Sequence, residues 1–216
     1  MQEYHLQVER TARYYTLGNE KSDELWIVLH GYRTLASDFI QSFAPIADDA
    51  FIVAPEALSR FYSKGSGGPE SPSSVGASWM TKEDRLNEIK DHTAYLDKLY
   101  THIAKSKPKR LILLGFSQGC PAVMRWVARG NVKPDHVLIW SGDVPRDLDF
   151  DAYKAAGVRE TLMINGDNDT LLDSSIYVEG ETLLATHNIP SATIHFAGGH
   201  EIPADALTEV RKRIVG

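Results

Sequence analysis

Residues 111–119 constrain the fold of this chain more than any other stretch. Their sequence, Leu-Ile-Leu-Leu-Gly-Phe-Ser-Gln-Gly, begins as an apolar run, stops at Gly115 and passes into apolar residues at helical spacing. The pattern predicts a buried strand, a sharp turn and a helix. At such a turn Ser117 has strained backbone angles, and Gly115 and Gly119 leave room where a Cβ would collide with neighbouring backbone. The string G-x-S-x-G alone is a weak signal, so the predicted strand and helix around it carry the inference.

Short apolar runs predict the other strands of a mainly parallel sheet. These runs cover residues 25–29, 51–54, 111–114, 137–140, 161–164 and 193–196. Strands that are apolar on both faces are typical of a parallel sheet covered by helices on both sides. The chain therefore reads as one α/β domain over residues 1–216, with strands and helices alternating after the N-terminal part.

Two segments at the N-terminal end and one long helix complete the expected elements. Residues 4–8 alternate apolar and polar side chains and residues 13–17 favour β structure, which predicts a half-buried antiparallel pair. Residues 81–105 show helical periodicity, starting with a capping-box-like Thr81 and Asp84 and ending before Pro108.

Residues 59–78 consist mostly of Ser, Gly and Pro. This composition predicts a long loop without regular structure. A loop of this length in a compact domain is usually functional or disordered. Because it follows the carboxyl end of the strand at 51–54, where α/β sheets bind ligands, we expect it to form a wall of the active site.

Composition excludes several classes of protein. The net charge is -6 and no long block of like charge occurs, which argues against a nucleic-acid partner. We expect no signal peptide, because the N-terminus has no basic region followed by an apolar run, and no stretch approaches the length of a membrane span. The single cysteine, Cys120, excludes an internal disulfide framework and suits a cytoplasmic location.

A serine hydroxyl requires an adjacent base to act as a nucleophile, and histidine is the residue that most often supplies it. Of the eight histidines, His200 follows the last predicted strand directly, in a Gly-rich segment that leads into a final helix. The other histidines lie within strands or helices or at their ends, and His30 precedes the serine in the chain. The order Ser, Asp, His and this position after the last strand both favour His200 as the base.

Three aspartates compete for the third position of a catalytic triad. Asp167 and Asp169 end the strand at 161–164, and Asp143 follows the strand before it. Asp167 resembles a residue that caps the local turn, so we favour Asp169. Its role would be to accept a hydrogen bond from His200 and stabilise the imidazolium without taking the proton.

The negative oxygen of a tetrahedral intermediate also needs hydrogen-bond donors. One is the backbone N–H of Gln118, at the start of the predicted helix, where free amides and the helix dipole favour negative charge. The second is expected in the segment after the strand at 25–29, where Gly31 allows close approach of the backbone and the N–H of Tyr32 is the best candidate. No spacing of His, Asp or Glu predicts a metal site, and the chemistry requires no cofactor.

These residues together resemble the phospholipase/carboxylesterase family of α/β hydrolases, which includes acyl-protein thioesterases and small bacterial carboxylesterases. The resemblance spans nearly the whole chain. It is carried by the following pieces: Leu29-His30-Gly31, Trp79 before an acidic helix, Gly115-Phe116-Ser117-Gln118-Gly119, Ser141-Gly142-x-x-Pro145, Gly166-Asp167-x-Asp169 and Gly199-His200. It implies an α/β-hydrolase fold, the triad Ser117, Asp169 and His200, and an oxyanion hole formed by Tyr32 and Gln118.

The expected function is hydrolysis of carboxylic esters with short acyl groups through an acyl-enzyme on Ser117. A thioesterase or lysophospholipase acting on long acyl chains is the main alternative, and a non-catalytic binding protein of this fold is an alternative of another class. We expect Phe61, Tyr62, Trp79 and Leu171 to contact the substrate, a small-molecule ester. The protein is expected to be a monomer or homodimer without stable membrane insertion.

Overall fold

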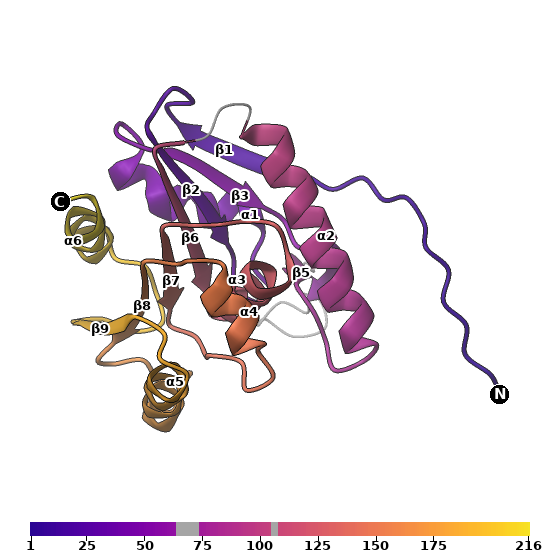
Figure 1. The fold of residues 1–216 in the computed structure, drawn as a ribbon. Helices are drawn as coiled ribbons and strands as arrows, with labels where there is room; N and C mark the ends of the chain where they lie inside the picture. The colour runs from indigo at the N-terminus through magenta and orange to yellow at the C-terminus, as the bar shows by residue number, and fades with distance from the viewer. Residues whose placement is uncertain (64–73, 105–107) are drawn as a thin grey trace.

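The predicted apolar runs form the centre of a seven-stranded sheet in the computed structural model, which describes residues 1–63, 74–104 and 108–216 (Figure 1). The strands of this sheet are β1 (Tyr14–Gly18), β2 (Glu24–Leu29), β3 (Phe51–Pro55), β6 (Arg110–Phe116), β7 (His136–Trp140), β8 (Glu160–Gly166) and β9 (Ser191–Phe196). Their order across the sheet is β1-β3-β2-β6-β7-β8-β9. Only β1 runs antiparallel to its neighbour, so the predicted mostly parallel α/β-hydrolase sheet is confirmed.

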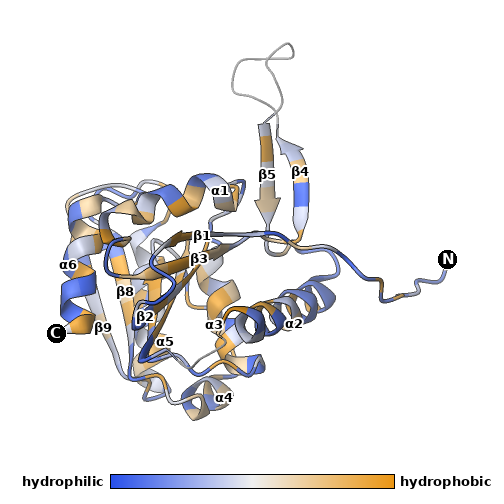
Figure 2. Cartoon of the chain, turned by 90° about the horizontal axis from the view of Figure 1, so that it is seen from above, coloured by the Kyte–Doolittle hydropathy of each residue, from blue (hydrophilic) through white to orange (hydrophobic). Residues whose placement is uncertain are grey.

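Nearly every residue of the central strands is buried, because helices cover both faces of the sheet. The helices are α1 (Ala36–Phe39), the 3₁₀ helix η1 (Ile40–Ile46), α2 (Arg85–Ile103), α3 (Gly119–Arg129), α4 (Phe150–Ala155), α5 (Ser174–Thr186) and α6 (Ala204–Val215). Apolar side chains of α2 to α5 pack in one core, and those of α1, η1 and α6 pack in a second core (Figure 2). None of the helices in the described part of the chain is long and apolar enough to cross a membrane.

The expected antiparallel pair at the N-terminus is wrong. Residues 4–8 form no strand, and Tyr4, Leu6 and Val8 are exposed on an arm that extends away from the sheet (Figure 1). The segment at 13–17 does form a strand, but this strand, β1, pairs with β3, which follows η1 in the chain. Alternation of side chains identifies a possible strand, whereas its hydrogen-bond partner is set by tertiary packing.

Helix α2 begins at Arg85, four residues later than expected. Asp84, the expected fourth residue of a capping box, has left-handed backbone angles and precedes the helix. Instead, the Thr81 hydroxyl and N–H both donate hydrogen bonds to the carboxylate of Glu88. Thr81 therefore lies before the helix and is held against its first turn by these two bonds. The expected end of the helix at residue 105 lies outside the described residues.

The segment at 59–78 is partly regular, which corrects the prediction of a loop without secondary structure. Strands β4 (Ser59–Ser63) and β5 (Ser74–Ser78) pair antiparallel to form a separate two-stranded hairpin that stands off the main sheet (Figure 2). Residues 64–73 lie outside the described residues. The Ser- and Gly-rich composition predicted a loop because these residues have low β propensity. The hairpin forms nevertheless, because the backbones of β4 and β5 pair through antiparallel hydrogen bonds that do not depend on side chains.

Candidate active site

The turn between β6 and α3 has the geometry that the sequence predicted. Ser117 has φ of 51°, a left-handed angle that is strained for a residue with a side chain. A Cβ added to Gly115 would lie 2.4 Å from the carbonyl oxygen of Gly119, and one added to Gly119 would lie 2.2 Å from that of Leu29. Both glycines are therefore required for α3 to start so close to the sheet, and the turn presents Ser117 at the carboxyl end of β6.

His200 and Asp169 lie beside this turn and bond to each other. The Nδ1 atom of His200 is 2.8 Å from the Oδ2 atom of Asp169. The His200 ring packs on Phe116, the residue before Ser117, with ring centroids 4.9 Å apart. In the described part of the chain the Ser117 hydroxyl makes no hydrogen bond to His200, an arrangement common in unliganded sites of this kind.

The carboxylate of Asp169 is held by several donors. Besides His200 it accepts hydrogen bonds from the N–H groups of Leu171 and Leu172 and from the Tyr177 hydroxyl, 3.1 Å away. Burial raises the pKa of Asp169, but the bonds from His200, from the Leu171 N–H and from Tyr177 outweigh burial and leave this pKa below its ordinary value. Asp169 is therefore ionised near neutral pH and oriented toward His200.

The competing aspartates lie elsewhere. Asp167 is exposed and its carboxylate lies 3.4 Å from Nδ1 of His195, on the far side of the turn from His200. Asp143 follows β7 and lines a pocket beside α3, with no hydrogen bond or ion pair to another described residue. Of the three candidates, only Asp169 contacts His200.

The segment after β2 passes close to Ser117. A Cβ added to Gly31 would lie 3.1 Å from Cδ1 of Phe116 and 3.3 Å from Cβ of Ser117, so the backbone approaches this closely because Gly31 has no side chain. Neither the N–H of Tyr32 nor that of Gln118 donates a hydrogen bond to any residue in the described ranges. Gln118 also stands at the N-terminus of α3, where unbonded amides carry partial positive charge.

Buried rings of His30 and Trp79 support this segment, a role that the sequence analysis did not predict for them. His30 is fully buried; its Nδ1 lies 2.7 Å from the Gly31 carbonyl oxygen, and its Nε2 accepts a hydrogen bond from the Ala57 N–H. Burial lowers the pKa of His30, so the ring stays neutral. Trp79 donates a hydrogen bond from Nε1 to the His30 carbonyl, 2.8 Å away. Their only sequence signal is the position of His30 directly after an apolar strand.

The four expected substrate-contacting residues are dispersed. Phe61 of β4 stacks on the Tyr32 ring, with centroids 5.3 Å apart, beside the approach to Ser117. Tyr62 and Leu171 are exposed. Trp79 is only 3% exposed, because its ring packs between His30 and His92 in the core, and it therefore supports the site from behind instead of lining an open surface.

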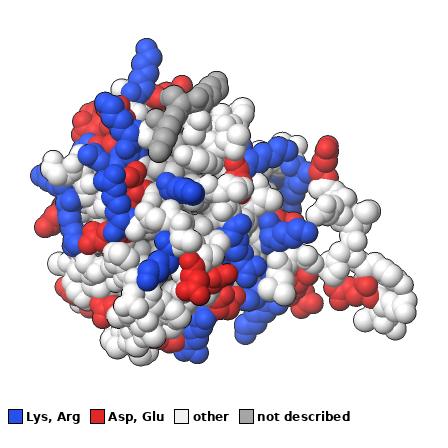
Figure 3. Space-filling view, in the orientation of Figure 1, with Lys and Arg blue, Asp and Glu red and all other residues white. Residues whose placement is uncertain are grey.

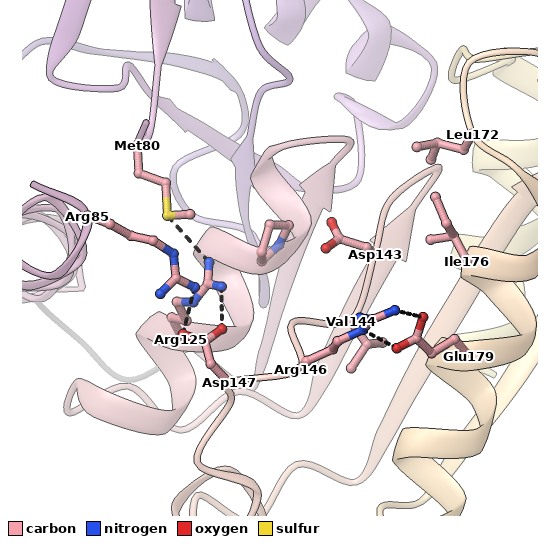
Figure 4. Close-up of a pocket in the computed structure, with 11 residues that line it drawn as sticks. Met80, Arg85, Arg125, Asp143, Val144, Arg146, Asp147, Leu172, Ile176 and Glu179 are labelled. Carbon is pink, nitrogen blue, oxygen red and sulfur yellow. Dashed lines mark hydrogen bonds and ion pairs between the residues drawn. The ribbon is translucent and has the colours of Figure 1, made fainter. Parts of the chain in front are cut away.

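A pocket of about 540 Å³ adjoins the other side of the turn (Figure 4). Its walls come from Met80 between β5 and α2, from α2 and α3, from the segment after β7, and from Leu172 with the first turns of α5. Apolar side chains and six charged side chains line it; the charged ones are Arg85, Arg125, Asp143, Arg146, Asp147 and Glu179. On the molecular face seen in Figure 3, acidic and basic side chains are likewise interspersed.

Comparison with known proteins places this site in a family. The sequence model described as "Serine hydrolase (FSH1)" matches residues 27–211. No curated protein sequence matches the chain.

Several solved structures share the fold. A carboxylesterase from Mesorhizobium loti is 19% identical over 95% of each chain, with a TM-score of 0.74. Zea mays acyl-protein thioesterase 2 is 17% identical, with 95% of this chain and 98% of that chain covered and a TM-score of 0.71. Esterase PE8 is 21% identical, with coverages of 95% and 99% and a TM-score of 0.68. At these identities the structures show a common fold, and the match over residues 27–211 shows that the chain belongs to the FSH1 serine hydrolase family.

Proposed function

We propose that this protein hydrolyses carboxylic esters, with Ser117 as nucleophile, His200 as general base and Asp169 as the residue that orients His200. The observation that carries the proposal is the 2.8 Å contact between His200 Nδ1 and Asp169 Oδ2, beside a serine held at a strained turn. The family match supports the same chemistry, because serine hydrolases act through an activated serine hydroxyl.

In the proposed reaction, the Ser117 oxygen attacks the ester carbonyl while Nε2 of His200 takes the hydroxyl proton. Asp169 accepts the hydrogen bond from Nδ1–H, which keeps the correct tautomer and stabilises the imidazolium. The tetrahedral intermediate collapses, His200 gives the proton to the departing alcohol, and the acyl group remains on Ser117. A water molecule, deprotonated by His200, then attacks the acyl-enzyme and releases the acid.

Two free backbone N–H groups, those of Tyr32 and Gln118, are proposed to bind the oxyanion. They belong to the two segments next to Ser117 and have no acceptor among the described residues. Loss of one such donor costs about 3 to 4 kcal/mol of transition-state stabilisation.

The surroundings of Ser117 favour short acyl groups. On the hairpin side, the ring of Tyr32, the residue after Gly31, stacks on Phe61, and we infer that this pair limits the space for an acyl chain. The pocket on the other side carries six charged side chains, which makes burial of a long alkyl chain there unfavourable. An acyl-protein thioesterase or lysophospholipase function remains the competing proposal, because a serine nucleophile attacks esters and thioesters alike and one fold neighbour is named an acyl-protein thioesterase.

Cellular location and assembly belong to the same proposal. We infer a cytoplasmic enzyme, supported by the single, buried cysteine. We infer a monomer or homodimer that takes a small-molecule ester and binds no nucleic acid, supported by the net charge of -6.

Labelling with a fluorophosphonate probe tests the proposal. The unmodified protein should be labelled and should hydrolyse p-nitrophenyl butyrate, whereas Ser117→Ala should lose both properties and keep its melting temperature. Ser191→Ala is the matched control, because Ser191 is exposed at the opposite end of the sheet and should leave labelling unchanged. Labelling that persists in Ser117→Ala would reject Ser117 as the nucleophile.

A further inference from the structure

The charged pocket beside α3, defined above and drawn in Figure 4, is connected to the proposed triad through two of its wall residues. The Met80 carbonyl accepts a hydrogen bond from the side chain of Gln118, the residue after Ser117. The Leu172 N–H lies 3.3 Å from Oδ1 of Asp169. The pocket therefore adjoins the two segments that carry Gln118 and Asp169.

The pocket contains one carboxylate without a partner. Arg146 pairs with Glu179, and Asp147 pairs with two arginines, but Asp143 has no hydrogen bond or ion pair to another residue in the ranges described. Figure 4 shows Asp143 between the arginines on one side and Leu172 and Ile176 on the other. Asp143 is exposed to solvent where it lines the pocket, and partial desolvation by the surrounding residues raises its pKa.

The opposite wall contains an excess of positive charge. Arg125, only 4% exposed, and Arg85 each lie 2.7 Å from Asp147, so two guanidinium groups share a single carboxylate. The Nε of Arg125 is buried and has no hydrogen-bond acceptor among the described residues. Because this atom is buried, it is not available to a ligand, and Arg125 contributes its positive charge to the pocket wall.

These charges restrict the ligand. An ammonium group bonded to Asp143 would face the two arginines that share Asp147, and a carboxylate bonded to Arg125 would face Asp143. A hydroxyl group avoids both conflicts, because it donates one hydrogen bond and accepts others. The apolar side chains of Val144, Leu172 and Ile176 suit the carbon atoms that carry such hydroxyls.

We propose that this pocket binds an uncharged, hydroxyl-bearing part of the ester substrate and that Asp143 determines this specificity by accepting a hydrogen bond from the hydroxyl. The inference rests on the proposed ester hydrolysis at Ser117 and adds the chemical class of the substrate. A glycerol ester and an ester of a hydroxylated acid both belong to this class, according to whether the alcohol or the acyl group enters the pocket.

Two pairs of isosteric esters test the proposal. In the first, 2,3-dihydroxypropyl butyrate is compared with 2-methylbutyl butyrate, and in the second, p-nitrophenyl 6-hydroxyhexanoate is compared with p-nitrophenyl heptanoate. Each pair gives a ratio of kcat/KM for the hydroxylated over the alkyl ester. Because a hydrogen bond to a charged group is worth roughly 10- to 100-fold in rate, Asp143→Ala should lower this ratio at least about tenfold in one pair while the alkyl ester is hydrolysed no more slowly.

The control is Asp151→Ala, which removes an exposed aspartate outside the pocket and should leave both ratios unchanged. The proposal is overturned if neither ratio depends on Asp143, or if Asp143→Ala slows the alkyl and hydroxylated esters equally, as a role in catalysis or folding would. Faster, Asp143-dependent hydrolysis of butyrylcholine than of 2,3-dihydroxypropyl butyrate would instead identify a cation site. If the unmodified protein hydrolyses none of these esters, the proposed function itself fails.

Discussion

Ser117 lies between two surfaces that are built differently. On the hairpin side, main-chain groups fix the structure: the Arg33 N–H donates to the Ala77 carbonyl, and the Gln118 side chain binds the Trp79 N–H. Behind them stand the uncharged buried rings of His30 and Trp79. On the pocket side, charged side chains form the walls, among them the buried Arg125 and its partly exposed partner Asp147.

The contrast indicates a division of labour. Backbone donors held by buried contacts keep their positions whatever substrate arrives, which suits oxyanion binding in any ester hydrolysis. A single substitution can replace a charged side chain in the pocket wall without moving the backbone. Such a wall is suited to selecting among substrates. The following predictions test this division, beginning with the largest effect.

The catalytic contacts should be far more sensitive than nearby charges. Asp169→Asn should lower kcat about 10⁴-fold, because an amide favours the wrong tautomer of His200. Asp167→Asn, which removes the same charge two residues away at an exposed site, should change kcat less than about threefold. Steady-state kinetics with p-nitrophenyl butyrate, with melting temperatures as a check on folding, measure both. A larger loss in Asp167→Asn, or in Asp143→Asn, would show that another aspartate orients His200.

The buried rings of the hairpin side should make stability depend on pH. His92, on α2 against Trp79, has no hydrogen-bond partner for either ring nitrogen among the described residues, and burial lowers its pKa to about 4. Below its unfolded pKa of about 6.5 the unfolded chain binds a proton that the folded protein excludes, so stability falls from pH 6.5 toward pH 4.

Replacing His92 separates this effect from other titrations. Between pH 7 and pH 5, His92 should account for roughly 2 kcal/mol of lost stability. In His92→Phe the decrease in the free energy of unfolding between pH 7 and pH 5 should therefore be smaller by roughly 2 kcal/mol. Urea unfolding at both pH values measures it. His102→Phe is the control, because this histidine lies exposed on the same helix. An equal loss in the His92 variant and the unmodified protein would contradict the prediction.

Close packing at Gly31 should matter for rate and not for stability. In Gly31→Ala the new methyl group must displace Phe116 or Ser117 by a few tenths of an ångström. Small misplacements of reacting groups are costly, so kcat/KM should fall about tenfold. Gly157→Ala is the comparison variant, because its Cβ would meet nothing within 4 Å and its positive φ should reduce stability alone. Equal kcat/KM for both variants would argue against a constrained oxyanion segment.

The smallest effect concerns acyl length. In the unmodified protein kcat/KM should peak at acyl chains of about two to six carbons, since each further methylene adds about 0.8 kcal/mol only where it is buried. If Phe61 limits the acyl site, Phe61→Ala should move the peak toward longer chains. Each methylene that the enlarged site then buries should raise kcat/KM by up to roughly fourfold. Trp79→Ala should instead lower the melting temperature, because Trp79 is buried. A steady rise up to palmitoyl esters would favour the thioesterase or lysophospholipase function.

Much of the fold followed from local patterns. The six apolar runs all lie in strands of the main sheet, because a strand that is buried on both faces must be apolar along its length. The turn at Ser117 was predictable for a related reason, since backbone that approaches another segment this closely tolerates only glycine at positions 115 and 119. Position after the last strand favoured His200 among eight histidines, and this histidine contacts Asp169 in the structure.

Pairings between distant segments were not predictable. The sequence favoured Asp169 over Asp143 and Asp167 by its position in the turn, but which of these carboxylates contacts His200 depends on the packing of the loop after β9. The paired strands β4 and β5, the unpaired arm at residues 4–8 and the buried position of Trp79 likewise differ from what the local sequence indicated.

The amino-acid sequence by itself therefore determined six strands of the main sheet, the turn at Ser117 and the family resemblance, because these depend on residues close together in the chain. Tertiary structure decided the partner of β1, the acid that contacts His200 and the pocket around Asp143, whose walls come from five separate segments. Hydrogen bonds and charge pairs of this kind depend on distances of about 3 Å between groups that are far apart in sequence, and only the packed sheet and its helices set those distances.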